Sequence, residues 1–330
     1  MSGRLLIEKP SMIFVVGCPR SGTSLLRDLL RSHPRLTFLP ETRFIPSFYR
    51  AYGDPTSDAD ARRLARAILQ MPWVRRWNPD LEPDDFAGYR SYRDVVEHFF
   101  HEWARQEGKP RWGDKTPAYV AEIPTLAGLF PEARFLHLIR DGRDVALSMI
   151  RAPFGPANFY RAAIVWKSSI EAGRRGAETL PSGMYMEVFY ESLLAQPETS
   201  LRAICGFLDE PFDDAMLRPN RLRRDGTGVS PPDASSDSIV TGNILKWKRL
   251  ARPEDVGVFE TVAADLLEEL GYETTGTGRS LPATRRLSWE IQDRVKRSLD
   301  LVRARHRLRD YLLLRRSRVR ARLRSMGLAR

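Results

Sequence analysis

The stretch that most constrains the fold is an apolar run, Met12 to Val16, followed at once by a loop that contains Gly17 and Gly22. Valines in such a run predict a buried strand, and the leucine spacing after Gly22 predicts an amphipathic helix. A strand, a tight glycine turn and a helix N-terminus bring free backbone N–H groups to one point, where the helix dipole also favours negative charge. The sequence therefore predicts an anion-binding loop over residues 17–24.

The side chains of this loop suit phosphate or sulfate. Arg20 can bind such an anion through two parallel hydrogen bonds, and Ser21, Thr23 and Ser24 add hydroxyl donors. The spacing is close to the Walker A pattern G-x-x-x-x-G-K-[ST], but Thr23 stands where that pattern has Lys. An NTPase needs this Lys at the β- and γ-phosphates, so the pattern argues against NTP hydrolysis.

A second predicted anion site follows a second apolar run. Residues 133–139 predict a buried strand, and Arg140 stands directly after it. Ligands of open α/β sheets bind at the carboxyl ends of the strands. A Walker B strand would end in a metal-binding Asp, whereas this one presents Arg first. We therefore expect a site that uses arginine and no metal, for a ligand with two separated phosphates.

Alternating strands and helices predict a parallel sheet with helices on both faces. The expected strands are residues 12–16, 133–139 and 184–189, the last of which is interpreted as a third inner strand. Residues 36–39 are expected to be a short extended piece, and residues 111–119 a second stretch that is interrupted by Gly and Pro. The fold class is thus α/β, with a P-loop-like central sheet and a C-terminal basic helical extension.

Charge divides the chain into two parts. The whole chain carries a net charge of +11, but residues 285–330 hold 16 Lys and Arg against 4 Asp and Glu, which leaves a net charge of −1 for the rest. We expect an α/β domain over residues 1–275, then a linker and a basic amphipathic tail over residues 276–330. This tail could bind an anionic membrane surface, pack on the body or form an oligomer; it lacks the interleaved aromatic residues typical of nucleic-acid binding.

Composition argues against a membrane span, a signal peptide and a disulfide framework. No stretch of 18 apolar residues and no signal-peptide pattern are present, and two cysteines are too few for a disulfide framework. We expect a cytoplasmic protein, with the tail leaving open a peripheral location at the inner membrane face.

Four short motifs occur in this order along the chain: Cys18–Ser24, His33-Pro34, Glu41-Thr42-Arg43, and Ile139–Asp144 with Ser148. Together they resemble those of sulfotransferases that use 3′-phosphoadenosine 5′-phosphosulfate (PAPS), above all the protein-tyrosine sulfotransferase branch and its bacterial relatives. The first motif resembles the 5′-phosphosulfate loop of that family and the last its 3′-phosphate motif, and the resemblance covers about residues 11 to 273.

The resemblance implies a role for each matching residue. The residues implied to hold the 5′-phosphosulfate are Arg20, Ser21, Gly22, Thr23 and Ser24, and those implied to hold the 3′-phosphate are Arg140 and Ser148. Glu41 would be the general base, while Lys115 and Arg20 would neutralise charge on the sulfuryl group and the departing phosphate. Other residues implied to lie near the nucleotide are Tyr190, Ser235 and Lys246.

The predicted function is in-line sulfuryl transfer from PAPS to a hydroxyl of a small molecule, glycan or lipid, without metal. The alternatives are a P-loop kinase or other NTP-dependent transferase, and a non-catalytic module that binds nucleotide or membrane. Glu41 could instead be a helix N-terminal charge, and Lys115 a surface residue of a turn. Because many sulfotransferases use His as the base, His33 and His101 are reserve candidates.

Overall fold

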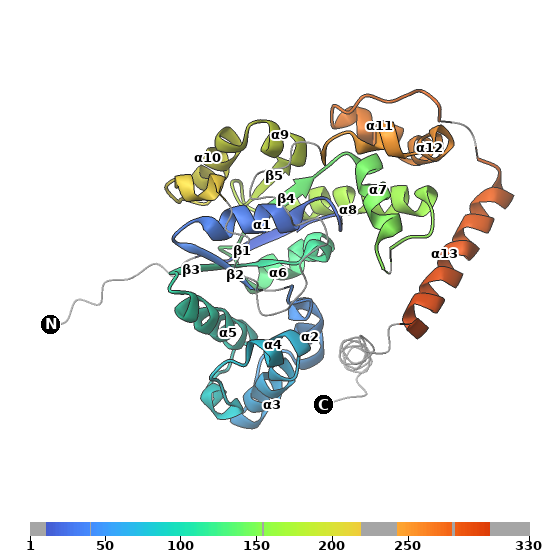
Figure 1. Ribbon diagram of the computed structural model, residues 1–330. Coiled ribbons are helices and arrows are strands. Elements are labelled where there is room, and N and C mark those ends of the chain that lie inside the picture. Colours follow the sequence, from blue (N-terminus) through green and yellow to red (C-terminus); the bar gives the residue numbers. More distant parts are fainter. Residues whose placement is uncertain (1–10, 40, 154, 219–242, 279–280, 304–330) are drawn as a thin grey trace.

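The computed structural model describes residues 11–39, 41–153, 155–218, 243–278 and 281–303 (Figure 1). Its centre is a five-stranded sheet in the order β2-β3-β1-β4-β5, in which every neighbouring pair is parallel. The strands are β1 (Ile13–Gly17), β2 (Leu36–Leu39), β3 (Arg111–Lys115), β4 (Arg134–Ile139) and β5 (Tyr185–Phe189). The predicted α/β class with a central parallel sheet is confirmed.

Helices account for most of the remaining described chain. The α-helices are α1 (Thr23–Ser32), α2 (Ile45–Tyr52), α3 (Asp58–Leu69), α4 (Pro72–Trp77), α5 (Tyr92–Glu107), α6 (Ile123–Leu129), α7 (Gly142–Arg151), α8 (Phe159–Ala177), α9 (Tyr190–Ala195), α10 (Pro197–Phe207), α11 (Lys246–Leu250), α12 (Pro253–Glu269) and α13 (Ala283–Arg303). Three short 3-10 helices are η1 (Pro83–Phe86), η2 (Pro117–Glu122) and η3 (Asp214–Leu217).

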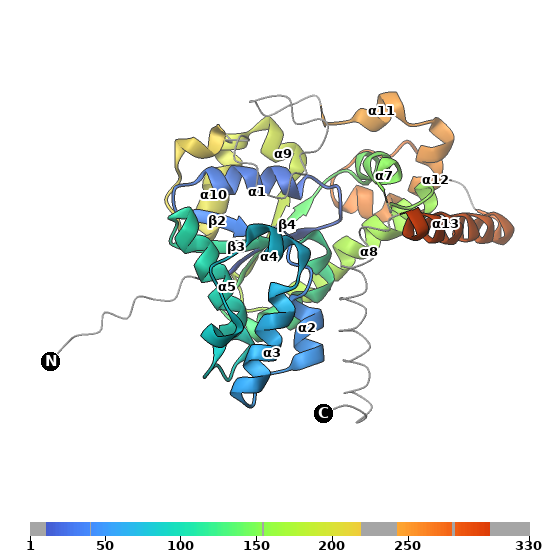
Figure 2. The same cartoon turned by 60° about the horizontal axis from the view of Figure 1, so that its bottom comes forward.

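The sheet is buried on both faces, and β1 shows how. Ile13 and Val15 pack into one apolar cluster together with α1, α9 and α10, whereas Phe14 and Val16 point the other way, into a cluster that contains α5 and α6. Figure 2 shows α1, α9 and α10 together on one side of the strands. A strand covered on both faces needs an apolar side chain at every position, which is the pattern of residues 12–16.

The strand order fixes where a ligand can bind. The chain leaves β1 toward β2 and β3 on one side of it, and then passes to β4 and β5 on the other side. Parallel strands place all of their carboxyl ends at one edge of the sheet, and a reversal of this kind opens a crevice at that edge. The residues that follow β1, β2, β3, β4 and β5 therefore converge there.

The sequence analysis missed one strand and placed another wrongly. Residues 111–115, for which no strand was expected, form the strand β3 between β1 and β2. The strand β5 was expected to be an inner strand, but it lies at the edge of the sheet, and most of its side chains are only half-buried.

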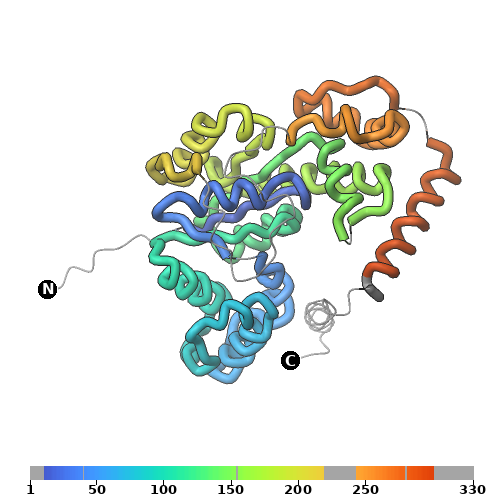
Figure 3. Tube along the Cα trace, viewed as in Figure 1, coloured from blue at the N-terminus to red at the C-terminus, as the bar shows by residue number. Residues whose placement is uncertain are grey.

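Helices α11, α12 and α13 lie together on one side of the molecule, as the orange and red part of Figure 3 shows. Helix α12 packs on α7 and α8, and α13 contacts α8. The division of the chain at residue 275 stays a prediction. Among the helices of the described residues, none is long and apolar enough to cross a membrane.

Candidate active site

The loop after β1 depends on two glycines. Gly17 has φ +149° and Gly22 has φ +102°, and a Cβ at Gly22 would lie 2.5 Å from the ring of Tyr190. The loop closes through a hydrogen bond in which the Ser21 N–H donates to the Cys18 carbonyl, at 3.2 Å. Only glycine combines this backbone conformation with so close an approach, so Gly22 sets the shape of the loop.

The loop presents unsatisfied donors. Helix α1 starts at Thr23, and no side chain caps its N-terminus, which leaves N–H groups of the first turn without an intrahelical partner. The hydroxyl of Ser21 is buried and has no hydrogen-bond partner among the described residues. Buried polar groups without partners are costly, and an anion at this helix N-terminus would satisfy them.

Glu41, Lys115 and Ser24 meet beside this loop. The Lys115 ammonium donates to Glu41 Oε1 at 2.7 Å and to Ser24 Oγ at 3.4 Å. Arg43 also donates to Glu41, with Nε 2.9 Å from Oε2. Lys115 is 4 % exposed, so it is not the surface lysine of a turn. It links the candidate base to the anion-binding loop.

The two cations determine the charge of Glu41. Burial alone would raise the pKa of Glu41, but Lys115 and Arg43 outweigh it and lower this pKa to about 2. Burial lowers the pKa of Lys115, and the neighbouring Glu41 opposes that effect. Glu41 is thus ionised at neutral pH and has a carboxylate that can accept a proton.

A buried polar cluster holds the segment that carries Glu41. The Thr42 N–H donates to Asp114 Oδ2 at 3.3 Å, and the Thr42 hydroxyl lies 2.8 Å from the Tyr119 hydroxyl. The Tyr119 oxygen also accepts from the Ile45 N–H at 3.0 Å. Asp114 and Tyr119 follow each other closely on β3 and η2, so this stretch of chain fixes the position of Glu41 relative to Lys115.

Arg140 lies at the carboxyl end of β4 and is 8 % exposed. One of its nitrogens, Nη2, donates to Asp144 Oδ2 at 3.1 Å and to the Asn243 carbonyl at 2.5 Å. Its guanidinium carbon lies 4.4 Å from the ring centroid of Tyr190. Its Nε–H is buried with no hydrogen-bond partner among the described residues. Arg140 thus retains a donor for a further acceptor.

The structure brings the two predicted anion sites together. Tyr190 touches both, because its ring edge lies against Gly22 and its ring face lies beneath the guanidinium of Arg140. The Arg20 Nε–H donates to Ser148 Oγ at 3.1 Å, which joins the loop after β1 to helix α7. Both anion sites therefore open at the same edge of the sheet.

A buried ion cluster supports the Arg140 side of the site. Arg143 is 1 % exposed and pairs with Asp141 at 2.9 Å and with Glu260 at 2.8 Å. Its guanidinium carbon lies 3.8 Å from the ring centroid of Trp247, whose indole N–H donates to Asp141 at 3.0 Å. The cluster fixes the start of α11, so Lys246 is held at this edge through its neighbour Trp247.

Three residues that the sequence analysis considered for the site are not among those described above: Ser235, His33 and His101. Ser235 lies outside the described residues. The reserve bases are wrong for this site: His33 is buried at the far end of α1, where its ring contacts the Pro211 carbonyl at 2.8 Å. His101 is exposed on α5 and packs edge-on against Trp112.

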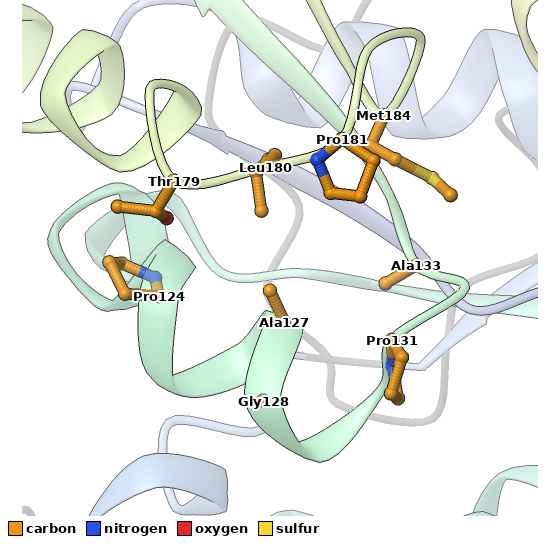
Figure 4. A pocket seen from close by; sticks show the side chains of 9 residues that line it. All are labelled: Pro124, Ala127, Gly128, Pro131, Ala133, Thr179, Leu180, Pro181 and Met184. Carbon is orange, nitrogen blue, oxygen red and sulfur yellow. The ribbon is translucent and has the colours of Figure 1, made fainter.

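The hollow drawn in Figure 4 is a different feature. It has a volume of about 360 Å³ and is lined by small and apolar residues that include Ala133 and Met184. These two precede β4 and β5, so the hollow lies at the amino edge of the sheet, opposite the residues described above. No group of three or more His, Cys, Asp or Glu residues suited to a metal ion occurs within the described part of the chain.

Sequence reasoning assigned no role to Asp114, Tyr119, Arg143 or Trp247. Asp114 and Tyr119 flank Lys115 in the chain, and Arg143 follows Arg140 by three residues, so proximity to predicted site residues was the available signal. Trp247 follows Lys246 directly, but Arg143, which stacks on its ring, is about a hundred residues away in the sequence.

Comparisons with known proteins agree with one another. The model of a family described as "Sulfotransferase family" matches residues 10–214. Protein-tyrosine sulfotransferase A of Caenorhabditis elegans is 30% identical over 275 residues, which cover 79% of this chain and 67% of that protein. Protein-tyrosine sulfotransferase 1 of Homo sapiens is 29% identical over 276 residues, 79% of this chain and 70% of that protein.

Solved structures show the same fold. The sulfotransferase domain from the curacin biosynthetic pathway has a TM-score of 0.58 at 24% identity and covers 80% of this chain and 99% of that chain. The sulfotransferase domain from the Synechococcus PCC 7002 olefin synthase has a TM-score of 0.59 at 24% identity, over 80% of this chain and 95% of that chain. With the family match over residues 10–214 and the relatives above, the chain belongs to the sulfotransferase family.

Proposed function

We propose that this sulfotransferase transfers the sulfuryl group of PAPS to a hydroxyl acceptor by in-line displacement, with Glu41 as the general base. The observation that carries the proposal is the position of Lys115, whose ammonium contacts both Glu41 and Ser24 of the anion-binding loop. In-line transfer needs the base, a cation and the donor group side by side.

The unsatisfied donors of the site fit the two ends of PAPS. The Ser21 hydroxyl and the uncapped start of α1 lie at the loop proposed for the 5′-phosphosulfate. The unpartnered Nε–H of Arg140 lies at the ring of Tyr190, where we place the 3′-phosphate together with Ser148. Gly22, Thr23 and the half-buried Lys246 complete the proposed contacts with the nucleotide.

Each side chain has a defined task in this proposal. Glu41 accepts the proton of the acceptor hydroxyl, while Arg20 and Lys115 neutralise the charge that grows on the departing phosphate oxygen. Two cations weaken Glu41 as a base in the absence of ligand. When Lys115 turns from Glu41 Oε1 toward the donor, that oxygen becomes free to accept the proton and its basicity rises.

The proposed acceptor is a hydroxyl on a small molecule, glycan or lipid, and the names of the relatives add the tyrosine hydroxyl to the classes to be tried. Membership of the family favours sulfuryl transfer over an NTP-dependent reaction.

The test uses PAPS labelled with radioactive sulfate and acceptors of each class, including tyrosine peptides. Wild-type protein should label one class, and Glu41→Gln should lower the transfer rate by about 100-fold or more while still binding adenosine 3′,5′-bisphosphate. The matched control is Glu198→Gln, which removes a carboxylate from an exposed ion pair on α10. An undiminished rate with Glu41→Gln, or magnesium-dependent turnover of ATP in place of PAPS, would refute the proposal.

A further inference from the structure

Helix α13 packs on the body through a polar face. Asp293 is 3 % exposed, accepts from the Ala157 N–H at 2.9 Å and pairs with Arg161 at 3.6 Å. One turn further on, the Lys296 ammonium donates to the Gly155 carbonyl at 2.9 Å. Hydrogen bonds and ion pairs thus account for much of this contact, together with Trp289, which stacks on a tyrosine of α8.

The apolar face of α13 points away from the body. Leu287, Ile291, Val295 and Leu299 are 57, 51, 53 and 50 % exposed. Their spacing of four residues places them in one continuous stripe along the helix. Among the described residues, the other large apolar side chains with such exposure are Leu245 and Leu250 on and beside α11.

This arrangement is the reverse of an ordinary surface helix, which buries its apolar stripe against the core. A contiguous exposed apolar stripe marks a surface that another molecule covers. Both Figure 1 and Figure 2 show α13 at the outside of the molecule, beyond α7 and α8.

The positive charge around the stripe indicates which kind of molecule can cover it. Arg285 and Arg294 are exposed on α13 on either side of the stripe, and residues 304–330 add 10 Lys and Arg against one Asp. A second copy of this helix, or residues 304–330 folded back onto it, would bring positive charge against positive charge. An anionic bilayer instead attracts each of these arginines through its negative surface potential.

We propose that α13 docks on an anionic lipid bilayer, with the stripe Leu287–Leu299 inserted at the headgroup boundary and Arg285 and Arg294, which flank the stripe, on acidic headgroups. Apolar insertion and electrostatic attraction together provide the two signals that stable peripheral binding requires. The polar face would meanwhile stay on α8, so docking needs no unfolding of the contact at Asp293. This proposal is independent of the identity of the donor and of the acceptor.

The experiment measures co-sedimentation of the full chain with vesicles of pure phosphatidylcholine and with vesicles that also contain phosphatidylglycerol. The test variant combines Leu287→Gln, Ile291→Gln, Val295→Gln and Leu299→Gln. Leu250→Gln is the matched control, because it removes an exposed leucine from another helix. Sedimentation velocity without lipid reports the oligomeric state of each protein.

Wild-type protein should bind the anionic vesicles, and the fourfold variant should bind them about tenfold or more weakly, while Leu250→Gln matches wild type. Equal binding by the fourfold variant, or none by wild type, would overturn the proposal. So would a wild-type dimer that the fourfold variant dissociates, since a second copy would then cover the stripe. If the fourfold variant does not fold, Arg285→Gln with Arg294→Gln, which leaves the stripe intact, must weaken binding at low salt.

Discussion

Replacing Asp114 by Asn tests whether burial raises the pKa of the Asp114 carboxyl in the polar cluster beside Glu41. Asp114 is fully buried at the end of β3, where its Oδ2 accepts from the Thr42 N–H. Burial, with a smaller contribution from the charge of Glu41, raises the pKa of Asp114 to about 7, against the hydrogen bond from Thr42. Asn has nearly the same shape, keeps an acceptor oxygen for Thr42, and cannot ionise.

The linkage between protonation and folding determines whether the ionisation of Asp114 raises or lowers the free energy of unfolding. A carboxyl whose pKa is higher in the folded than in the unfolded protein costs stability as pH rises from the unfolded pKa, 3.8, through the folded pKa of about 7. The difference of about 3 pKa units corresponds to a cost of up to about 4 kcal/mol above pH 7. About two thirds of that cost arises between pH 5 and pH 8, so the stability of Asp114→Asn relative to wild type should rise by about 2–3 kcal/mol over this interval.

Urea unfolding at pH 5 and pH 8 measures this change directly. The control is Asp265→Asn: Asp265 is exposed, and its pKa is lowered mainly by a hydrogen bond from Lys167. Its difference from wild type should stay constant, because both its folded and its unfolded pKa lie below pH 5. A free-energy difference between Asp114→Asn and wild type that is equal at the two pH values would show that Asp114 is already ionised in the folded protein at pH 5, and would refute the reasoning.

Three further predictions concern the surroundings of Arg140 and the anion-binding loop. Gly22→Ala should weaken binding of adenosine 3′,5′-bisphosphate by about tenfold or more, since its Cβ would lie 2.5 Å from the ring of Tyr190; calorimetric titration showing unchanged affinity would contradict this. Arg143→Met should lower the free energy of unfolding by about 3–5 kcal/mol, because Asp141 and Glu260 would remain buried without a cation; a loss below about 1 kcal/mol in urea unfolding would contradict it. Gly22→Ala should cost less affinity in the Tyr190→Ala background than in wild type, because the clash with the ring is gone; an equal loss in both backgrounds would show that the ring does not limit the loop.

The central strands and the two anion motifs were predictable because their signals are local. The run at 12–16 is apolar at every position, as a strand covered on both faces requires. The glycine spacing of the following loop and the position of Arg140 directly after β4 are likewise readable within a few residues.

The strand β3 was not predictable, because its polar residues are satisfied by distant partners. Arg111 lies in the first position of β3. It is buried, and its charge is neutralised by a salt bridge at 3.2 Å to Glu210, nearly a hundred residues later in the chain. Lys115 is buried against Glu41 in the same way. A sequence pattern assigns such charged residues to the surface, since it does not show which charges neutralise one another.

The helical character of α13 was readable from its periodicity, but its orientation was not. The apolar stripe suggested packing on the body as one of several alternatives. The structure instead places Asp293 and Lys296 against the body, where the acceptors and donors around residues 155–161 satisfy them.

The central claim is that two anion sites, at the ends of β1 and β4, bind opposite ends of one doubly phosphorylated adenosine. The most direct measurement is calorimetric titration of wild type and Arg140→Ala with adenosine 3′,5′-bisphosphate and with adenosine 5′-monophosphate, which lacks the 3′-phosphate. Wild type should prefer the bisphosphate by about tenfold or more, as hydrogen bonds to a charged group imply, and Arg140→Ala should lose most of that preference. An unchanged preference in Arg140→Ala, or none in wild type, would contradict the claim.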